Sequence, residues 1–255
     1  MNNKLSRKKR KHRQNQKGAT RKKKNIWMNW ETRNVRNPKR KHLTLNKLDA
    51  IPYLDEHGNK IDIKCEREEQ YVAHDFIEPN STVLELGGRY GMVSAVINHK
   101  LEKPTHHVVV EPDTMVLPSL KQNKQSHQCH FRIIHGIVSN KPQFLSQNGY
   151  ATQTTTKRVS DASPVQLFSI EDIQNKYKLH FDTLVADCEG CLGTFIEENK
   201  HFVTHQLKYI MFEADMPKLC DYSKIRRLLH KAGFRVVVKG FVSFWQKKQP
   251  TKQCF

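Results

Sequence analysis

Apolar and polar positions follow two periods along residues 65–246, and together they predict an α/β domain. Short apolar runs bounded by turn residues predict buried strands, whereas apolar residues spaced three and four apart predict helices. Because the two kinds of element alternate, the sheet is expected to be mostly parallel, seven-stranded and doubly wound. Strands are expected over residues 82–86, 107–111, 131–135, 181–186 and 209–212, and helices over 66–77, 91–101, 115–126, 170–177, 191–199 and 222–232.

Three further segments stand outside this alternation. Residues 51–63 predict a small hairpin that turns near Gly58. Near the C-terminus, residues 235–239 and 242–245 predict an antiparallel hairpin. Residues 139–164 are rich in Gln, Thr and Ser and are predicted to form a loop that could cover a crevice.

Three predicted strands have an acidic residue at or beside their carboxyl end. These residues are Glu85, Glu111 and Asp187. The carboxyl edge of an open α/β sheet is where ligands bind. Glycines follow the first strand and let the backbone approach a ligand closely; they are Gly87, Gly88 and Gly91. The acid after the second strand has about the spacing of a ribose-binding carboxylate. The pattern predicts a site for an adenosyl group, although the glycine run alone would also suit a tight turn.

These motifs resemble a known family. The segment from Glu85 to Gly91 resembles the S-adenosylmethionine loop of class I methyltransferases. Other segments resemble the FkbM-type methyltransferases: Glu111-Pro112 with Leu120 and Asn123, Asp187-Cys188-Glu189-Gly190, and Phe212-Glu213. The resemblance covers roughly residues 65–240, and it departs from the usual pattern at Gly88-Arg89, Val185 and Leu192.

The resemblance implies a Rossmann-like methyltransferase fold, with its last strand inserted antiparallel, and S-adenosyl-L-methionine as cofactor. It implies these cofactor-binding residues: Glu85 at the ammonium group, Gly87, Gly88 and Gly91 along the methionine, Glu111 and Pro112 at the ribose, Ile137 near the adenine, and Asp187. Candidate bases for the transfer are Asp187, Glu189 and, less directly, Glu213. The alternative is that Asp187 binds the ammonium group while Glu189 caps the following helix.

The segment after the fourth strand also bears on the methyl acceptor. Enzymes that methylate exocyclic amines of nucleic acids usually carry (Asn/Asp/Ser)-Pro-Pro-aromatic there, whereas this chain has Asp187-Cys188-Glu189-Gly190. Cytosine-C5 methylases need a cysteine nucleophile, commonly in a Pro-Cys pair, which this sequence lacks. We therefore expect a methyltransferase that modifies a hydroxyl of a glycan or another small molecule.

The charge of the chain is concentrated at its N-terminus. Of the net +19, residues 1–47 contribute +17, from 18 Lys and Arg against Glu31 alone. The first 24 residues contain 12 Lys or Arg and too few apolar residues to offset the entropy of ordering. Residues 1–41 are thus predicted to be a disordered basic tail, followed by a methyltransferase domain over 42–255. A tail of this kind suits a nuclear address or an arm that binds nucleic acid or another polyanion.

That tail keeps a second function open, namely a nucleic-acid-binding protein or RNA methyltransferase whose methyltransferase-like domain is secondary or degenerate. The sequence has no apolar run long enough to span a membrane and no secretory leader, so an intracellular, cytoplasmic or nuclear protein is expected. Its six cysteines are accordingly expected to be reduced thiols. The single C-x-x-C pair lacks a second pair, and no metal site is predicted. The oligomeric state is left open.

Overall fold

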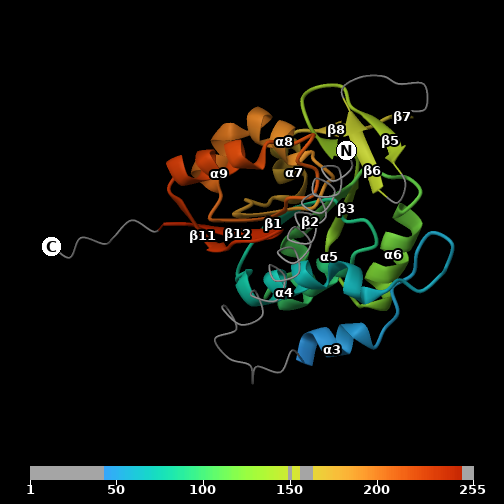
Figure 1. Cartoon of the computed structure of the whole chain (residues 1–255). Helices are drawn as coiled ribbons and strands as arrows, with labels where there is room; N and C mark the ends of the chain where they lie inside the picture. The colour runs from blue at the N-terminus through green and yellow to red at the C-terminus, as the bar shows by residue number, and fades with distance from the viewer. Residues whose placement is uncertain (1–42, 149–150, 156–162, 249–255) are drawn as a thin grey trace, which may run out of the picture. The chain divides into compact units, whose positions relative to one another are not determined.

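The computed structural model describes residues 43–148, 151–155 and 163–248 (Figure 1). The predicted basic tail, residues 1–41, lies outside these described ranges. Among the helices in them, none combines the length and the apolar character needed to cross a membrane.

A seven-stranded sheet forms the centre of the domain, in the order β3-β2-β1-β9-β10-β12-β11. Neighbours from β3 to β10 are parallel, and β12 runs antiparallel to both β10 and β11. The prediction of a mostly parallel, doubly wound sheet of the methyltransferase type is confirmed. The strands are β1 (Val83–Leu86), β2 (His107–Glu111), β3 (Arg132–His135), β9 (Thr183–Ala186), β10 (Tyr209–Glu213), β11 (Phe234–Val238) and β12 (Val242–Lys247).

Helices cover both faces of this sheet (Figure 1). On one side lie α4 (Arg67–Phe76), α5 (Met92–Lys100) and α6 (Leu117–Ser126), with the short α3 (Leu43–Asp49) beyond them; on the other lie α7 (Ile170–Tyr177), α8 (Leu192–Glu198) and α9 (Tyr222–Lys231). Two single turns precede α4 and β10, η2 (Ile63–Glu66) and η4 (Phe202–Gln206). Helix α7 begins with a capping box, in which Ser169 and Asp172 exchange hydrogen bonds.

Alternation along the strands decides what each face contacts. Successive side chains of a strand point to opposite faces. Leu84, Leu86 and Val110 accordingly belong to the core cluster that includes the apolar residues of α7, α8 and α9. Glu85, one position away from two of these, points to the opposite face, where α4 and α5 lie. The same alternation assigns the ionisable side chains at the strand ends to one face or the other.

Two predictions for irregular segments were wrong in part. Residues 139–164 were expected to form a loop, but they contain a three-stranded sheet of β5 (Phe144–Asn148), β6 (Ala151–Thr155) and β7 (Ser163–Pro164). Backbone ladders can hold polar strands together, which hydrophobic periodicity does not reveal. The predicted hairpin at 51–63 is reduced to one bridge, between Leu54 and Lys60. A short parallel pair, β4 (Ile137–Val138) and β8 (Leu167–Phe168), lies beside the main sheet's carboxyl edge.

Candidate active site at the carboxyl edge of the sheet

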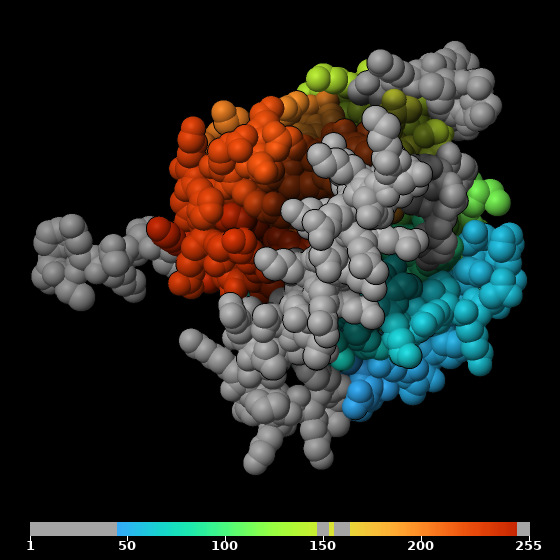
Figure 2. Space-filling model, viewed as in Figure 1, coloured from blue at the N-terminus to red at the C-terminus, as the bar shows by residue number. Residues whose placement is uncertain are grey.

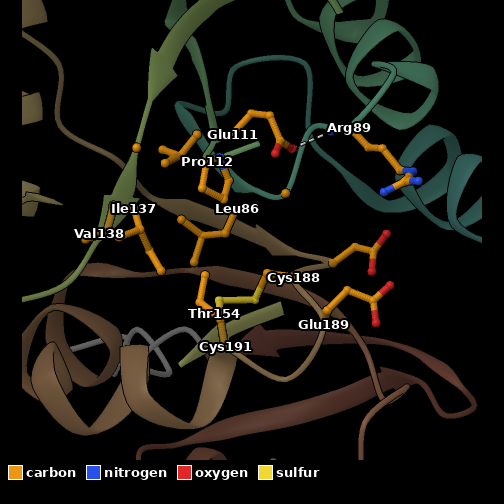
Figure 3. A pocket seen from close by; sticks show the side chains of 14 residues that line it. Leu86, Arg89, Glu111, Pro112, Ile137, Val138, Thr154, Cys188, Glu189 and Cys191 are labelled. Carbon is orange, nitrogen blue, oxygen red and sulfur yellow. Dashed lines mark hydrogen bonds between the residues drawn. A yellow bond between two sulfur atoms is a disulfide. The ribbon is translucent and has the colours of Figure 1, made fainter. Parts of the chain in front are cut away.

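A pocket of about 70 Å³ lies where β1, β2 and β9 end. Several apolar side chains and carboxylates line it, and Figure 3 shows Leu86, Pro112 and Ile137 grouped together, with Glu111 above them and Glu189 below and to the right. The predicted site residues that line it are Gly87, Glu111, Pro112, Ile137, Asp187 and Glu189; Glu85, Gly88, Gly91 and Glu213 do not. The structure thus brings six of the ten predicted positions to one pocket.

The loop after β1 depends on Gly87, whose φ is +84°. A Cβ atom built at this position would lie 1.8 Å from the backbone oxygen of Asp187, so no side chain fits between the two loops. Gly88 packs on Val109, where a Cβ would lie 2.2 Å from the Cγ1 atom. Gly91, with φ +80°, begins α5 behind the pocket. These glycines therefore serve the shape of the loop, and only Gly87 faces the pocket itself.

Glu111 is held by the same loop. Its Oε2 atom accepts hydrogen bonds from the backbone N–H groups of Gly88 (3.1 Å) and Arg89 (2.7 Å), and Oε1 accepts one from Asp113 (2.8 Å). A carboxylate has about four lone-pair sites. Three are used, so Oε1 retains acceptor capacity at the pocket wall. Burial raises the pKa of Glu111, while the three N–H donors oppose that rise.

Glu85 does not line the pocket, and its predicted contact with the cofactor's ammonium group stays a prediction. Its Oε2 atom lies 2.7 Å from Nε2 of His107, and both side chains are buried. The physical reason is strand alternation, since Glu85 and His107 share the face opposite to Leu86. The carboxylates that do line the pocket are Glu111, after β2, and Asp187 and Glu189, after β9.

The segment after β9 turns sharply. Glu189 adopts the left-handed conformation with φ +51°, and Gly190 follows with φ +89°. Cys188 and Cys191 form a disulfide bond across this turn, with 5.4 Å between their Cα atoms. The prediction that the cysteines are reduced was wrong for this pair, because the turn brings the two thiols together; Cys65, Cys129 and Cys220 are free. The turn and the crosslink together position Glu189, since strained backbone of this kind persists only when surrounding contacts hold it.

Behind the pocket, three carboxylates gather on the face covered by α4. One oxygen each of Glu69, Asp187 and Glu213 lies within 4.8 Å of the other two. Glu66 and Asp215 lie close enough to affect the ionisation of this cluster. The predicted site residues did not include Glu66, Glu69, Arg89 or Asp215. No spacing motif marks them, because α4 and the residues after β10 meet Asp187 only in the folded chain.

Burial and mutual repulsion raise the pKa of these acids. Burial is the largest cause for Glu213, followed by the charge of Asp187, and its pKa is strongly raised. The pKa of Glu69 rises for the same reasons. Loss of hydration raises the pKa of Glu66 to about 8, and burial with the neighbouring Asp215 raises that of Glu189 to about 7. Arg89 opposes these shifts at Glu66, Asp187 and Glu189.

These shifts predict that the domain loses stability as pH rises. A carboxylate whose pKa is raised in the folded state binds more protons folded than unfolded between its ordinary value of 4.5 and the raised value. Its contribution to the stability of the folded domain is therefore greatest below about pH 4.5, and this contribution is lost as pH rises through the folded pKa. We expect the thermal unfolding midpoint to be higher at about pH 5.5 than at about pH 8.5.

The control for this pH dependence is the double variant Glu69→Gln, Glu213→Gln, in which the difference between the two pH values should shrink. Glu102→Gln removes an exposed carboxylate outside the cluster and should leave that difference unchanged. Equal pH dependence in all three proteins would show that the cluster does not carry the effect.

The same cluster has the chemistry to attract cations. Carboxylate oxygens are the ligands that Mg²⁺ and Ca²⁺ prefer, so Glu69, Asp187 and Glu213 could hold such an ion, although the sequence predicted none. A sulfonium or ammonium group nearby would relieve the same repulsion. The pocket of about 70 Å³ is smaller than the 300–1,000 Å³ typical of ligand sites. An adjoining hollow of about 200 Å³ shares Ile137, Thr154 and Glu189 with the pocket.

Comparison with known proteins yields likeness in fold only. No family model matches the chain, and no curated protein is significantly similar in sequence. Among solved structures, precorrin-6Y C5,15-methyltransferase from Geobacter metallireducens aligns at 14% identity and TM-score 0.46, over 71% of this chain and 89% of that one. An NADB-Rossmann superfamily protein from Streptococcus agalactiae aligns at 10% identity and TM-score 0.45, over 72% and 70%.

The FkbM methyltransferase from Methylobacillus flagellatus aligns at 12% identity and TM-score 0.44, over 67% of this chain and 44% of that one. At these values the likenesses carry no argument about activity. The fold class therefore rests on the order and direction of the strands, and the function proposed below rests on the site.

Proposed function

We propose that this protein is an S-adenosylmethionine-dependent methyltransferase that acts on a hydroxyl group of a glycan or another small molecule. One observation carries the proposal: Glu111, Asp187 and Glu189 line a single pocket at the carboxyl edge of the sheet, where β2 and β9 flank β1. Carboxylates at the ends of parallel strands on the two sides of a central strand suit a ligand that has hydroxyls on one side and positive charge on the other.

The residues present fit the cofactor in three places. Glu111 would accept a hydrogen bond from a ribose hydroxyl through the free capacity of Oε1. The apolar side chains of Leu86, Pro112 and Ile137 would pack on the adenine. Asp187, with the acidic cluster behind it, would face the positively charged methionine part. When bound, the cofactor supplies an activated methyl group, so the protein has mainly to align the acceptor and exclude water.

Glu189 is the residue that we propose as the base. It lies on the boundary between the pocket and the hollow of about 200 Å³. Its carboxylate would accept the proton that the acceptor hydroxyl loses as its oxygen is methylated. A pKa of about 7 is close to the operating pH, which is favourable for general-base catalysis. Glu213 is less suited, because its raised pKa keeps it protonated and it does not line the pocket.

The adjoining hollow supports a neutral, hydroxylated acceptor. Its polar lining consists of hydroxyl and amide side chains: Ser139, Gln143, Thr154, Thr155 and Thr194. Among the described residues that line it, Glu189 is the one with an ionisable carboxylate, and none is a Lys or Arg. Hydroxyls and amides can donate and accept hydrogen bonds, as sugar hydroxyls require. A phosphorylated acceptor would find no cation in this lining.

The cofactor assignment predicts weaker binding when Glu111 is replaced. Glu111→Ala removes the ribose acceptor and also leaves three backbone N–H groups without theirs. We expect the dissociation constant for S-adenosylmethionine, measured by calorimetry, to rise by about 5- to 150-fold, which corresponds to about 1–3 kcal/mol.

The matched control for this binding measurement is Glu102→Ala, which removes an exposed carboxylate that does not line the pocket. It should leave the affinity unchanged. Identical affinity in the Glu111→Ala protein and the unmodified protein would remove the basis of the cofactor assignment.

A second function, binding of nucleic acid with the methyltransferase site secondary, remains the alternative that the charge of the chain favours. The described residues contribute one observation toward it, a basic groove at a different place in the domain. None of the residues that line that groove lines the methyltransferase site.

A further inference from the structure

We propose that a groove beside α9 binds the phosphate backbone of a nucleic acid. The groove has a volume of about 800 Å³, and all its lining residues come from the C-terminal part of the chain, drawn orange to red in Figure 2. They come from the segment between α8 and β10, from α9 and the residues just after it, and from β12; the basic ones are Lys200, Lys224, Arg227, Lys231 and Lys247. We call it the basic groove.

The lining of the basic groove is strongly cationic. Five of the ten lining residues are Lys or Arg, and none carries a carboxylate. Two acids lie nearby: Glu197 contacts Lys224 at 2.7 Å, and Asp221 lies 3.9 Å from Arg227. Five cations less these two acids leave a charge of +3. The four paired side chains are 62–66% exposed, so water screens both ion pairs and a phosphate can compete for the cations.

The shape of the basic groove also suits a nucleic acid strand. The cations stand along a concave surface with Leu228, Ala232 and Gly233 among them. A flat bilayer cannot contact the inside of such a groove, whereas a nucleic acid strand can lie along it. Among the described residues that line the groove, His205 has the one ring on which a base could stack. Contacts would thus be made mainly to phosphates, and binding would depend weakly on base sequence and strongly on salt.

The position of the basic groove separates it from the candidate active site. Residues of η4 lead into the amino end of β10, and Tyr209 there pairs with Gln246, next to Lys247. The pocket with Glu111 and Asp187 lies at the opposite, carboxyl edge. A five-residue strand spans about 15 Å, so the two sites are at least about that far apart. We infer that the basic groove anchors a nucleic acid and does not present the methyl acceptor.

A charge-neutralising variant of the full chain tests this proposal. Lys200→Gln, Arg227→Gln and Lys231→Gln would be combined, and binding of a fluorescent oligouridine RNA of about 20 nucleotides measured between about 50 and 200 mM salt. Each phosphate contact to a single strand contributes about 0.7 to the slope of log affinity against log salt. We expect the slope to fall by about 2 and the affinity at about 100 mM salt to fall at least about tenfold.

The matched control removes the same charge elsewhere in the domain, through Lys60→Gln, Lys103→Gln and Lys121→Gln, all at exposed positions. It should lose less than about threefold in affinity, because it changes only the general field of the protein. The N-terminal residues are identical in all these proteins, so their contribution cancels. Thermal unfolding would verify the fold of each variant, and the single variant Lys231→Glu provides a second test that perturbs one exposed side chain.

Three outcomes would overturn the proposal. Equal losses in the groove variant and its control would mean that only overall charge matters. Unchanged RNA affinity in the groove variants would mean that the basic groove makes no contact. Retained RNA affinity together with lost sedimentation on phosphatidylserine vesicles would assign the surface to a membrane. None of these readouts involves S-adenosylmethionine, so failure here is distinct from failure of the proposed methyltransferase.

Discussion

Glu189→Gln is expected to lower the rate of methyl transfer to a hydroxylated acceptor by about 10²–10⁴-fold, with a much smaller change in cofactor affinity. The substitution preserves the shape of the side chain but removes its ability to accept a proton. Glu189 lines both the pocket and the adjoining hollow, where the acceptor hydroxyl would lie. The measurement is transfer of a labelled methyl group, with a panel of carbohydrates and small hydroxylated molecules as acceptors.

Two comparisons make this result informative. Glu171→Gln alters an exposed carboxylate on α7 and should retain full turnover. Asp187→Asn is expected to weaken cofactor binding as well as turnover, because Asp187 faces the pocket and the acidic cluster together. Full turnover in Glu189→Gln would refute its role as the base and direct attention to Asp187 and then Glu213. Labelled RNA or protein, in the absence of any labelled small molecule, would refute the proposed acceptor class.

Gly87→Ala is expected to destabilise the domain far more than Gly233→Ala, although the two glycines have nearly the same backbone conformation. Gly87 and Gly233 have nearly equal φ values, +84° and +85°. A Cβ at Gly233 would meet nothing within 4 Å, whereas at Gly87 it would lie 1.8 Å from the backbone oxygen of Asp187. The backbone of Asp187 directly follows the central strand β9 and donates a hydrogen bond to Leu86, so it cannot move aside cheaply. We expect Gly233→Ala to cost about 1–2 kcal/mol and Gly87→Ala about 3 kcal/mol or more.

Urea unfolding of both variants measures this difference directly, because the two substitutions add the same methyl group in the same region of φ. Loss of cofactor binding should accompany Gly87→Ala, since the first loop and the turn after β9 would separate. Similar stability of the two variants would show that the first loop, at Gly87, does not pack closely against the backbone of Asp187.

The regular elements could be predicted from the sequence because their signals are local. Helix α7 matches its predicted range, 170–177, and β2 matches 107–111, since period and capping residues are contained in the segments themselves. The small sheet of β5, β6 and β7 could not be predicted in this way. Its strands are polar and are stabilised by pairing with one another, which no single segment reveals.

The same distinction between local signals and tertiary contacts applies to the candidate site. That acids follow β2 and β9 is a property of the sequence, and the parallel order of these strands made their convergence on one edge predictable. The face to which each acid points depends on strand alternation, and here Glu85 turns to His107 while Leu86 lines the pocket. Glu69 approaches Asp187 only because α4 packs over that edge. Local patterns therefore determined the elements and the acids at their ends, whereas pairing and packing decided which of those acids share a site.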